Sequence, residues 1–356
     1  MFCLLYARRK QNAFRRAGKT FLNLRGARKV FLFVSMEAGK KLPRVEIFMA
    51  CDANYAPHLC AAMASVMDNT RRSLRFNILS NALPEEIRAK IAECAGTRAE
   101  VEFLEVDKSL FAGFDVKLKH LSIEACYRYC AAKIRPELGK AVYLDCDTVV
   151  LGDIGELFDY DISGVCAGVV DDVIKESYVK SLGLGRYFNS GVMLLNLAKM
   201  RETRADERLF KTTAELSGKS KYLDQDALNI VFAGDEIFLP QKWNAVAPLF
   251  RRSPKSKFAP PRELAEAAEN PAIAHFTGPD KPWKIPRSML AHPFAPAYFY
   301  YLSKTPFAAE ARKFRASFRP LPSLANYFKR HLFFFLRPQF WKMRRLYACN
   351  LGRFRG

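Results

Sequence analysis

The sequence predicts an α/β domain whose sheet is largely parallel and covered by helices on both faces. Three observations lead to this fold class. Short apolar runs alternate with segments of helical spacing between Val45 and Leu144, and hydrophobic residues make up 50% of the 356-residue chain, which is enough for a sizeable core. Acidic residues also directly follow two of the apolar runs, at Asp52 and Asp145. In such sheets, ligands bind beyond the carboxyl ends of the strands.

The strands and helices of this core can be assigned in chain order. Helical segments are expected where apolar side chains recur on one side, as Leu59, Met63 and Val66 do, or where a proline such as Pro84 opens the first turn. Short runs rich in β-branched and aromatic residues are typical of strands. In order along the chain, the predicted elements are strand Val45–Cys51, helix Ala56–Met67, strand Arg75–Leu79, helix Pro84–Cys94, strand Glu100–Val106, helix Ser122–Ile134 and strand Ala141–Leu144.

The net charge of +21 is concentrated at the two ends of the chain. Residues 1–44 carry 12 Lys and Arg side chains against one acid, residues 300–356 carry 13 against one, and residues 45–299 hold 32 basic and 34 acidic side chains. We therefore expect a globular domain at 45–299, a basic N-terminal extension at 1–44 and a basic tail at 300–356. The N-terminal extension either associates with a surface or is not translated, if synthesis begins at Met36.

The cysteines and the apolar segments indicate a reducing compartment and a chain without a membrane-spanning helix. The nine cysteines form no CxxC pair, and several, such as Cys51 and Cys166, lie inside apolar runs. They are typical of small buried residues in a reducing compartment. No apolar stretch approaches the ~20 residues that a membrane-spanning helix needs. We therefore expect no membrane-spanning helix.

The segment YLDCDTVV sets two carboxylates, Asp145 and Asp147, two residues apart directly after an apolar run. Such a pair, leaving a strand, can converge on one Mn²⁺ or Mg²⁺ ion, since both ions prefer oxygen ligands. The ion could neutralise a diphosphate leaving group. The alternative is a pair of loop acids that cap a helix or face solvent.

The segment HFTGPDKPW begins at His275 and places a glycine and a lysine close behind it. Gly278 permits a close backbone approach, and Lys281 supplies a point charge suited to phosphate. One loop could therefore provide a metal ligand and two diphosphate contacts. A structural histidine followed by a Gly-Pro turn and a solvated lysine is the alternative.

Two further segments, FNSGVMLLNL and YLDQDALN, place polar side chains against apolar runs. Asn189, Asp224, Gln225 and Asp226 would need hydrogen-bond partners if they are buried. Helix capping by Asp224 is the alternative to a functional role.

Taken together, these motifs resemble glycosyltransferase family 8. The likeness covers roughly residues 45–300, is strongest to the bacterial lipopolysaccharide galactosyl- and glucosyltransferases, and rests on six motifs in order: CDANYAPHL, YLDCDTVVLGDI, YFNSGVMLLNL, YLDQDALNIVF, LPQKWN and HFTGPDKPW. It implies a Rossmann-like GT-A fold, a UDP-sugar donor such as UDP-galactose or UDP-glucose, Mn²⁺, and transfer with retention of anomeric configuration.

The resemblance also implies roles for individual residues. A family arginine or lysine that precedes the acid pair is matched by Lys133, with Arg128 as the alternative. By likeness, the uridine is contacted by Ala50, Asp52 and Asn54; the metal by Asp145, Asp147 and His275; the diphosphate by Gly278 and Lys281; and the donor sugar and reacting centre by Asn189, Asp224 and Gln225.

The basic tail bears on where the protein is located in the cell. Phe328, Leu332 and Phe335 stand at helical spacing among bases, which is typical of a helix on an anionic membrane surface; packing on the catalytic domain is the alternative. We expect peripheral attachment to the cytoplasmic face of the inner membrane and a lipid-linked saccharide acceptor, such as a lipopolysaccharide or lipooligosaccharide core.

Two rival functions remain open from the sequence. The basic ends could bind nucleic acid, and the acid pair could serve a metal-dependent nucleotide phosphohydrolase. We expect no nucleic-acid partner, because the central domain is not basic and contains no nucleic-acid-binding motif.

Overall fold

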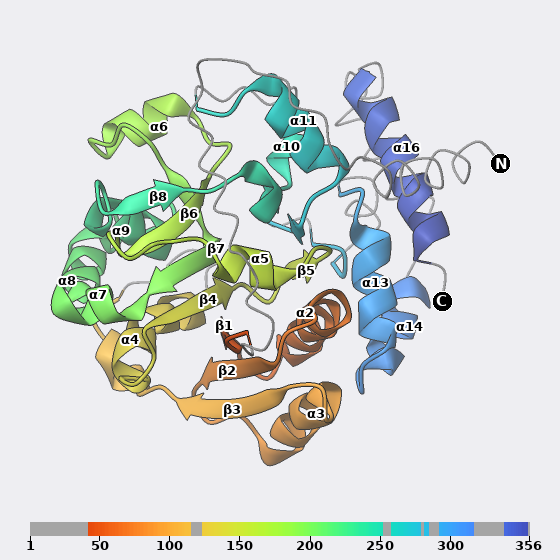
Figure 1. The fold of residues 1–356 in the computed structure, drawn as a ribbon, viewed down its shortest axis with the longest axis horizontal. Helices are drawn as coiled ribbons and strands as arrows, with labels where there is room; N and C mark the ends of the chain where they lie inside the picture. The colour runs from red at the N-terminus through yellow and green to blue at the C-terminus, as the bar shows by residue number, and fades with distance from the viewer. Residues whose placement is uncertain are drawn as a thin grey trace. The chain divides into compact units, whose positions relative to one another are not determined.

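A computed structural model of the protein has a seven-stranded sheet at its centre, with strand order β3-β2-β1-β4-β7-β6-β8 (Figure 1). The structure describes residues 42–114, 123–251, 258–278, 281–284, 292–316 and 338–354. The strands of this sheet are β1 (Val45–Ala50), β2 (Leu74–Ser80), β3 (Glu100–Glu105), β4 (Lys140–Leu144), β6 (Ala167–Asp171), β7 (Phe188–Asn196) and β8 (Glu236–Phe238).

The parallel sheet predicted for the first four strands is confirmed. β1 pairs in parallel with β2 and β4, and β2 pairs in parallel with β3. β7 instead runs antiparallel to both β4 and β6. Because of this reversal, β7 begins at the edge of the sheet where β4 and β6 end, and Leu144 lies across from Val192.

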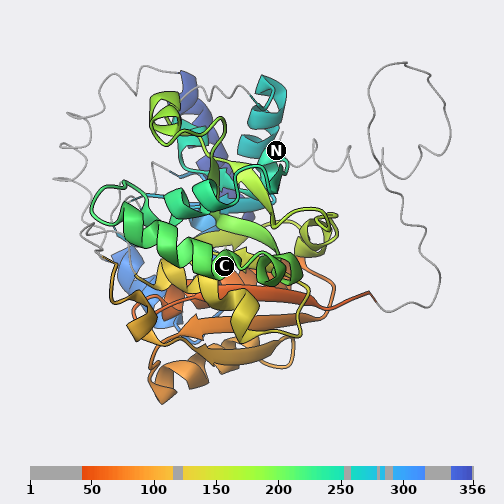
Figure 2. The ribbon, with the colours of Figure 1, turned by 90° about the vertical axis from the view of Figure 1, so that its left-hand side faces the viewer.

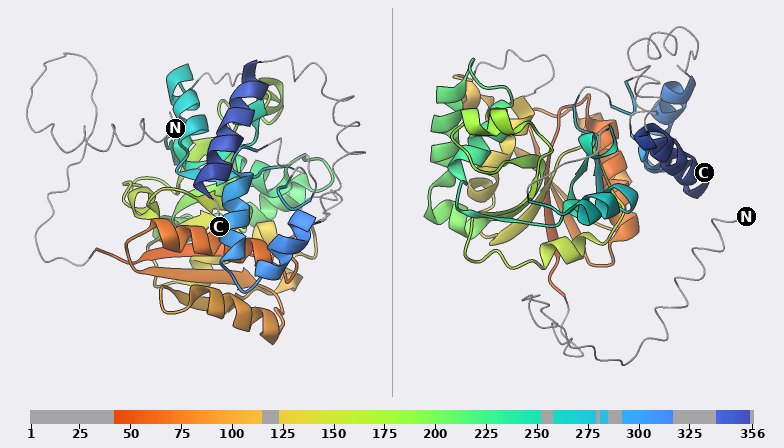
Figure 3. Two further views of the ribbon diagram at one scale, coloured as in Figure 1. Left: turned by 90° about the vertical axis from the view of Figure 1, so that its right-hand side faces the viewer. Right: turned by 90° about the horizontal axis from the view of Figure 1, so that it is seen from above.

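Helices cover both faces of the sheet, as Figures 2 and 3 show from the two sides. A hydrophobic core lies on each face of the sheet, and successive side chains of β1 point into one and then the other. Ile47 and Met49 pack on the side of α2, and Phe48 packs on the opposite side. The first face carries α2 (Ala56–Asn69), α3 (Glu85–Ala95) and α13 (Ala295–Ser303), and the second carries α7 (Leu197–Glu202), α8 (Ala205–Leu216) and α9 (Leu223–Val231).

The helices predicted at Ala56–Met67 and Pro84–Cys94 are confirmed as α2 and α3, but the third prediction needs correction. Instead of one α-helix over Ser122–Ile134, the chain forms a 3₁₀ helix, η2 (Ile123–Cys130), followed by one α-turn, α4 (Ala131–Ile134). All five residues of 126–130 are buried, so this segment is enclosed on every side and its form is set by tertiary packing. Arg128 consequently points into the protein.

A smaller three-stranded sheet, β5-β10-β9, lies beyond the end of β4. Its β10 strand pairs antiparallel with β5 and parallel with β9. The remaining elements are η1 (Lys108–Phe111), β5 (Thr148–Val150), α5 (Ile154–Phe158), α6 (Glu176–Ser181), η3 (Gln241–Trp243), β9 (Ala245–Val246), α10 (Pro248–Arg251), α11 (Pro261–Glu269), β10 (Ile273–His275), α14 (Ala308–Ala316) and α16 (Pro338–Arg353).

The C-terminal helices pack on the domain where they are described. α13 runs through position 299, where the sequence predicts a boundary, and its Tyr301 hydroxyl accepts a hydrogen bond from Asn69 of α2 at 2.8 Å. In α16, Asn350 is buried and donates to the carbonyl of Pro293 at 3.0 Å. The predicted stripe of Phe328, Leu332 and Phe335 lies outside the described residues. Among the described helices, none combines the length and the apolar character needed to cross a membrane.

Candidate active site

The predicted acid pair lies in the turn that joins β4 to β5. The Asp145 N–H donates to the carbonyl of Gly191 at 2.8 Å, and the Asp147 carbonyl accepts from the N–H of Phe276 at 2.9 Å. The thiol of Cys146 points the other way and donates to the Ala50 carbonyl at 3.1 Å. Both carboxylates therefore face the same side of the turn.

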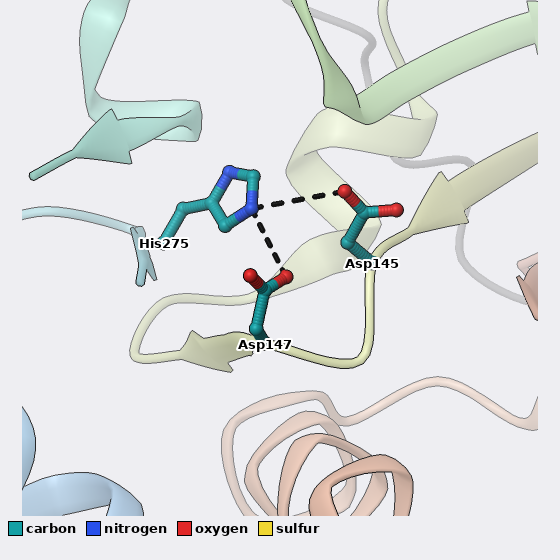
Figure 4. A group of neighbouring side chains, drawn as sticks. All are labelled: Asp145, Asp147 and His275. Atoms are coloured by element: carbon teal, nitrogen blue, oxygen red, sulfur yellow. Dashed lines mark hydrogen bonds and ion pairs between the residues drawn. The ribbon is translucent and has the colours of Figure 1, made fainter. Parts of the chain in front are cut away.

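His275 meets these carboxylates because β10 pairs with β5 in antiparallel register, with His275 across from Thr148. Its Nε2 atom lies 3.1 Å from Asp147 Oδ1 and 3.8 Å from Asp145 Oδ2 (Figure 4). One ligand atom from each of Asp145, Asp147 and His275 lies within 4.8 Å of the other two. We refer to these three residues as the Asp–Asp–His cluster.

The cluster has the composition of a site for a divalent cation. Carboxylate oxygens suit Mn²⁺ and Mg²⁺, and an imidazole nitrogen is a common third ligand. The space beside the cluster is also kept clear: a Cβ atom at Gly191 would lie 2.2 Å from His275 Cε1 and 2.5 Å from Asp145 Oδ2. The residues present therefore fit a metal ion. Gly191 has no side chain, so it leaves the space beside His275 and Asp145 open.

Lys281 pairs directly with Asp147, and its ammonium also donates to the Phe276 carbonyl at 2.8 Å. Burial alone would raise the pKa of the Asp147 carboxyl, but Lys281 and His275 together lower it below its ordinary value. Asp147 therefore remains ionised. Gly278 precedes Lys281 with φ of +80°, a conformation that favours glycine.

An aromatic stack holds the segment that carries Lys281. The Trp283 ring stacks on His58 of α2 with a centroid distance of 3.6 Å, and His58 Nδ1 lies 2.6 Å from the hydroxyl of Tyr298 on α13. Burial lowers the pKa of His58 to about 3, against the weaker opposing effect of Asp147. His58 is therefore neutral at ordinary pH, and α13 contributes to the surroundings of the site.

Of the two bases considered from the sequence, Arg128, which was the alternative, is the one that reaches Asp145. Arg128 is 3% exposed, its Nη2 atom lies 3.1 Å from Asp145 Oδ1 and 3.4 Å from Asp224 Oδ2, and it also donates to the Ser190 carbonyl. Lys133 has an exposed side chain on α4. The structure brings Arg128 to the cluster and leaves Lys133 at the surface.

The polar residues of β7 and α9 form one buried network beside the cluster. Asn189 Nδ2 donates to Gln225 Oε1 at 3.0 Å, and the Ser190 N–H donates to the same oxygen at 3.1 Å. Gln225 Nε2 donates in turn to Asp172 Oδ2 at 3.0 Å. Burial raises the pKa of Asp224, an effect that Arg128 opposes. Asn189 and Gln225 are thus hydrogen-bonded to each other, and Asp224 lies beside them through Arg128 and Ser190.

The residues predicted to contact uridine lie at the end of β1 and in the turn after it. Asp52 accepts a hydrogen bond from the N–H of Tyr55 at 2.9 Å and from Asn54 Nδ2 at 3.1 Å. The Ala50 carbonyl accepts a hydrogen bond from the Cys146 thiol, so this segment adjoins the turn that carries the acid pair. Burial, followed by Asp147, raises the pKa of the Tyr55 phenol to about 12, which keeps it protonated.

Sequence reasoning missed three residues of the site. Asn244 contacts both His275 and Asn189, Asp172 holds Gln225, and Gly191 leaves space beside His275. Asn244 ends the LPQKWN motif and Gly191 lies within FNSGV, so each is inside a segment that the sequence had already marked. Asp172 carried no comparable signal.

Comparison with known proteins decides the family. Residues 46–285 match the family described as Glycosyl transferase family 8. The chain belongs to glycosyl transferase family 8. The family resemblance expected from the sequence is therefore confirmed, and the protein is a glycosyltransferase.

Individual relatives of this family 8 enzyme span most of its globular part. General stress protein A of Bacillus subtilis (strain 168) is 29% identical over 272 residues, which cover 73% of this chain and 94% of that protein. Lipopolysaccharide 1,2-glucosyltransferase of Escherichia coli (strain K12) is 29% identical over 246 residues, which cover 65% of this chain and 70% of that protein.

Among solved structures, the galactosyltransferase LgtC in complex with donor and acceptor sugar analogs superposes with a TM-score of 0.64. It is 28% identical, and the match covers 74% of this chain and 96% of LgtC. The GT-A fold expected for this family 8 enzyme is confirmed by that similarity and by the seven-stranded sheet.

Proposed function

We propose that this glycosyltransferase is a metal-dependent retaining enzyme that transfers galactose or glucose from a UDP-sugar to a saccharide acceptor. The observation that carries the proposal is the convergence of the Asp–Asp–His cluster with Lys281 at the edge of the sheet where β4 ends. Two carboxylates, an imidazole and an ammonium at one place form a site for a divalent cation with a diphosphate.

Asp145, Asp147 and His275 would hold the metal, for which Mn²⁺ is our first choice and Mg²⁺ the second. When bound, the metal acts as a Lewis acid that offsets charge on the diphosphate leaving group. Lys281 provides a second positive charge at the same place, and the positive φ of Gly278 shapes the backbone before it. Both residues are assigned to the diphosphate.

The remaining predicted residues are assigned to the two ends of the donor. Ala50 ends β1, Asp52 and Asn54 lie in the turn after it, and all three are assigned to the uridine. The buried amide and carboxylate network beside the cluster is assigned to the donor sugar and the reacting centre: Asn189, Asp224 and Gln225.

We infer same-face displacement by the acceptor hydroxyl, without a protein nucleophile. The Gln225 amide is a poor nucleophile, and both of its polar atoms already take part in hydrogen bonds with Asn189 and Asp172. The Asp224 carboxylate is paired with Arg128, which favours a role in orienting sugar hydroxyls. A glycosyl–Asp224 adduct detected by mass spectrometry would contradict this mechanism.

The names of similar proteins support the choice of donor and acceptor. One relative is a lipopolysaccharide 1,2-glucosyltransferase and one solved neighbour is a galactosyltransferase. We therefore propose UDP-glucose or UDP-galactose as donor and a lipopolysaccharide or lipooligosaccharide core as acceptor.

Helix α16 supports peripheral attachment to an anionic membrane on the cytoplasmic side. Trp341 is 65% exposed, and the exposed side chains of Arg344 and Arg345 follow it on the helix, which carries no acidic residue. Lys342 also forms an ion pair with Glu269 at 2.9 Å. Each base near such a membrane contributes about 1 kcal/mol.

The test of the proposed function is a panel of UDP-galactose, UDP-glucose and UDP-N-acetylglucosamine with Mn²⁺ and with EDTA. We expect sugar release or transfer from one of the first two donors, in Mn²⁺ only. Activity that EDTA leaves intact would refute the metal assignment. Release of inorganic phosphate from the nucleotide, measured in a coupled assay, would indicate a phosphohydrolase instead.

Attachment to membranes is tested separately, with liposomes. We expect salt-sensitive binding to anionic liposomes, weaker binding by a variant in which Arg344 and Arg345 are replaced by glutamate, and no binding to RNA or DNA. Binding to nucleic acid in place of liposomes would reject the membrane assignment.

A further inference from the structure

Asn244 stands between the Asp–Asp–His cluster and the network assigned to the donor sugar. It follows η3, is 0% exposed, and contacts a residue on each side. Its Oδ1 atom lies 2.9 Å from His275 Nδ1, and its Nδ2 atom donates to Asn189 Oδ1 at 2.9 Å. The same side chain therefore touches a predicted metal ligand and a residue predicted to face the sugar.

Two backbone N–H groups determine the direction of the hydrogen bonds in this network. The Gly191 N–H donates to Asn189 Oδ1 at 3.1 Å, and the Ser190 N–H donates to Gln225 Oε1 at 3.1 Å. Because a backbone N–H can only donate, both of these side-chain atoms are acceptors. Asn189 Oδ1 must then face the NH₂ group of Asn244, which leaves Asn244 Oδ1 toward His275.

The orientation of Asn244 decides the protonation of the histidine ring. An amide oxygen accepts a hydrogen bond, so His275 Nδ1 must carry the proton that it donates. Nε2 is then the atom that faces Asp145 and Asp147. Without metal, a proton on Nε2 can be donated to Asp147 Oδ1 at 3.1 Å, and a bound metal ion would replace that proton and take the Nε2 lone pair. A metal-binding histidine needs the Nδ1–H tautomer, since a protonated Nε2 cannot coordinate a cation.

We propose that Asn244 is a positioning residue with two separable roles. Its Oδ1 holds His275 in the Nδ1–H tautomer for metal binding, and its Nδ2 holds Asn189, and through it Gln225, for sugar transfer. The proposal rests on the proposed function, because both roles presuppose a metal-dependent transferase. It adds a residue whose two polar atoms link the metal site to the reacting centre.

The two roles can be separated with two substitutions. Asn244→Ala removes both hydrogen bonds. Asn244→Asp keeps an oxygen acceptor for His275, since carboxylates hold metal-binding histidines in the same way, but it cannot donate to Asn189. The matched control is Asn196→Ala at the far end of β7, where a buried asparagine caps α7 by accepting from the Lys199 N–H at 3.0 Å.

The experiment measures Mn²⁺ affinity by calorimetry and transfer kinetics in all four proteins, with melting temperatures as the check on folding. We expect Asn244→Ala to weaken Mn²⁺ binding by about 10- to 100-fold, as loss of an outer-shell partner does, and to lose transfer. Asn244→Asp should keep Mn²⁺ affinity near the wild-type value yet lose transfer. Asn196→Ala should lower the melting temperature and leave Mn²⁺ affinity unchanged.

Several results would overturn the proposal. Wild-type Mn²⁺ affinity in Asn244→Ala would contradict the first role, and full transfer by Asn244→Asp would contradict the second. ¹⁵N shifts of His275 in the metal-free wild type provide a readout that needs neither metal nor activity. We expect a proton on Nδ1, whether or not Nε2 also carries one, and an unprotonated Nδ1 would refute the inference even if both variants fail to fold. A wild-type protein that binds no Mn²⁺ would instead count against the proposed function.

Discussion

Replacing Gly191 with alanine would place a methyl group between two members of the Asp–Asp–His cluster. The new Cβ would lie 2.2 Å from His275 Cε1 and 2.5 Å from Asp145 Oδ2, whereas ordinary contact begins at 3.4 Å. One or both side chains must therefore move by about 1 Å. Gly191 is not among the residues with positive φ, so the backbone accepts alanine and the effect is that of the methyl group alone.

The magnitude follows from that displacement. A misplacement of about 1 Å in a catalytic site can cost about 100-fold in rate, which corresponds to about 2.7 kcal/mol of transition-state stabilisation. Overpacking also destabilises a fold by about 1–3 kcal/mol. We therefore expect Gly191→Ala to lower kcat/KM by about 100-fold and to weaken Mn²⁺ binding, in a protein that remains folded.

The assay is UDP-sugar turnover in Mn²⁺, with Mn²⁺ titration by calorimetry and thermal unfolding on the same samples. The matched control is Gly168→Ala in the neighbouring strand β6, where the new Cβ would meet Leu239 Cδ1 at 3.1 Å and Ile162 Cγ2 at 3.3 Å, in the core. This control should lose stability while keeping wild-type kcat/KM. Wild-type turnover and Mn²⁺ affinity in Gly191→Ala would refute the placement of the cluster.

Three further predictions concern charges. Arg128→Ala removes the cation beside the buried Asp224 carboxylate and the partly exposed Asp145 carboxylate, so we expect a loss of about 3–5 kcal/mol in unfolding free energy together with the loss of transfer. Lys133→Ala should match the wild type, and equal effects of the two changes would contradict the placement of Arg128. Asp147→Asn should reduce transfer to the rate seen in EDTA with an unchanged circular dichroism spectrum, and full activity in this variant would reject the metal site. Because the pKa of His58 is about 3 in the folded protein against 6.5 ordinarily, the unfolded chain binds more protons below pH 6.5. Stability should therefore fall by about 2 kcal/mol between pH 7 and pH 5, and urea unfolding of His58→Phe should show that this loss has disappeared.

The local sequence pattern was sufficient to predict the elements whose form depends on residues close to one another in the sequence. The strand at β4 followed by Asp145 and Asp147 was readable because an apolar run and a two-residue spacing are both short-range features. The positions of α2 and α3 were equally readable from helical spacing and from Pro84. Parallel pairing of β1, β2, β3 and β4 then followed from their alternation with helices.

The local sequence pattern was not sufficient for the segment before β4, whose central residues 126–130 are all buried. The helical spacing of Ser122–Ile134 predicts an α-helix, yet the chain forms η2 and a single α-turn, which direct Arg128 inward and leave Lys133 outside. A shift between helix types rotates the side chains along the segment, so the residue that reaches the acid pair cannot be counted from its distance in sequence. Which of the two bases reaches the acid pair is therefore determined by tertiary packing.

The family, the acid pair and the polar segments around it can be read directly from the sequence, because each is a contiguous motif. How those segments meet depends on tertiary contacts. His275 reaches Asp147 across 128 positions through the β5–β10 pairing, and Gly191 reaches Asp145 through the reversal of β7. Such contacts depend on the path of the whole chain, and so does the position of Asn244, whose two amide atoms acquire their partners only when β7, β10 and the loop after η3 come together.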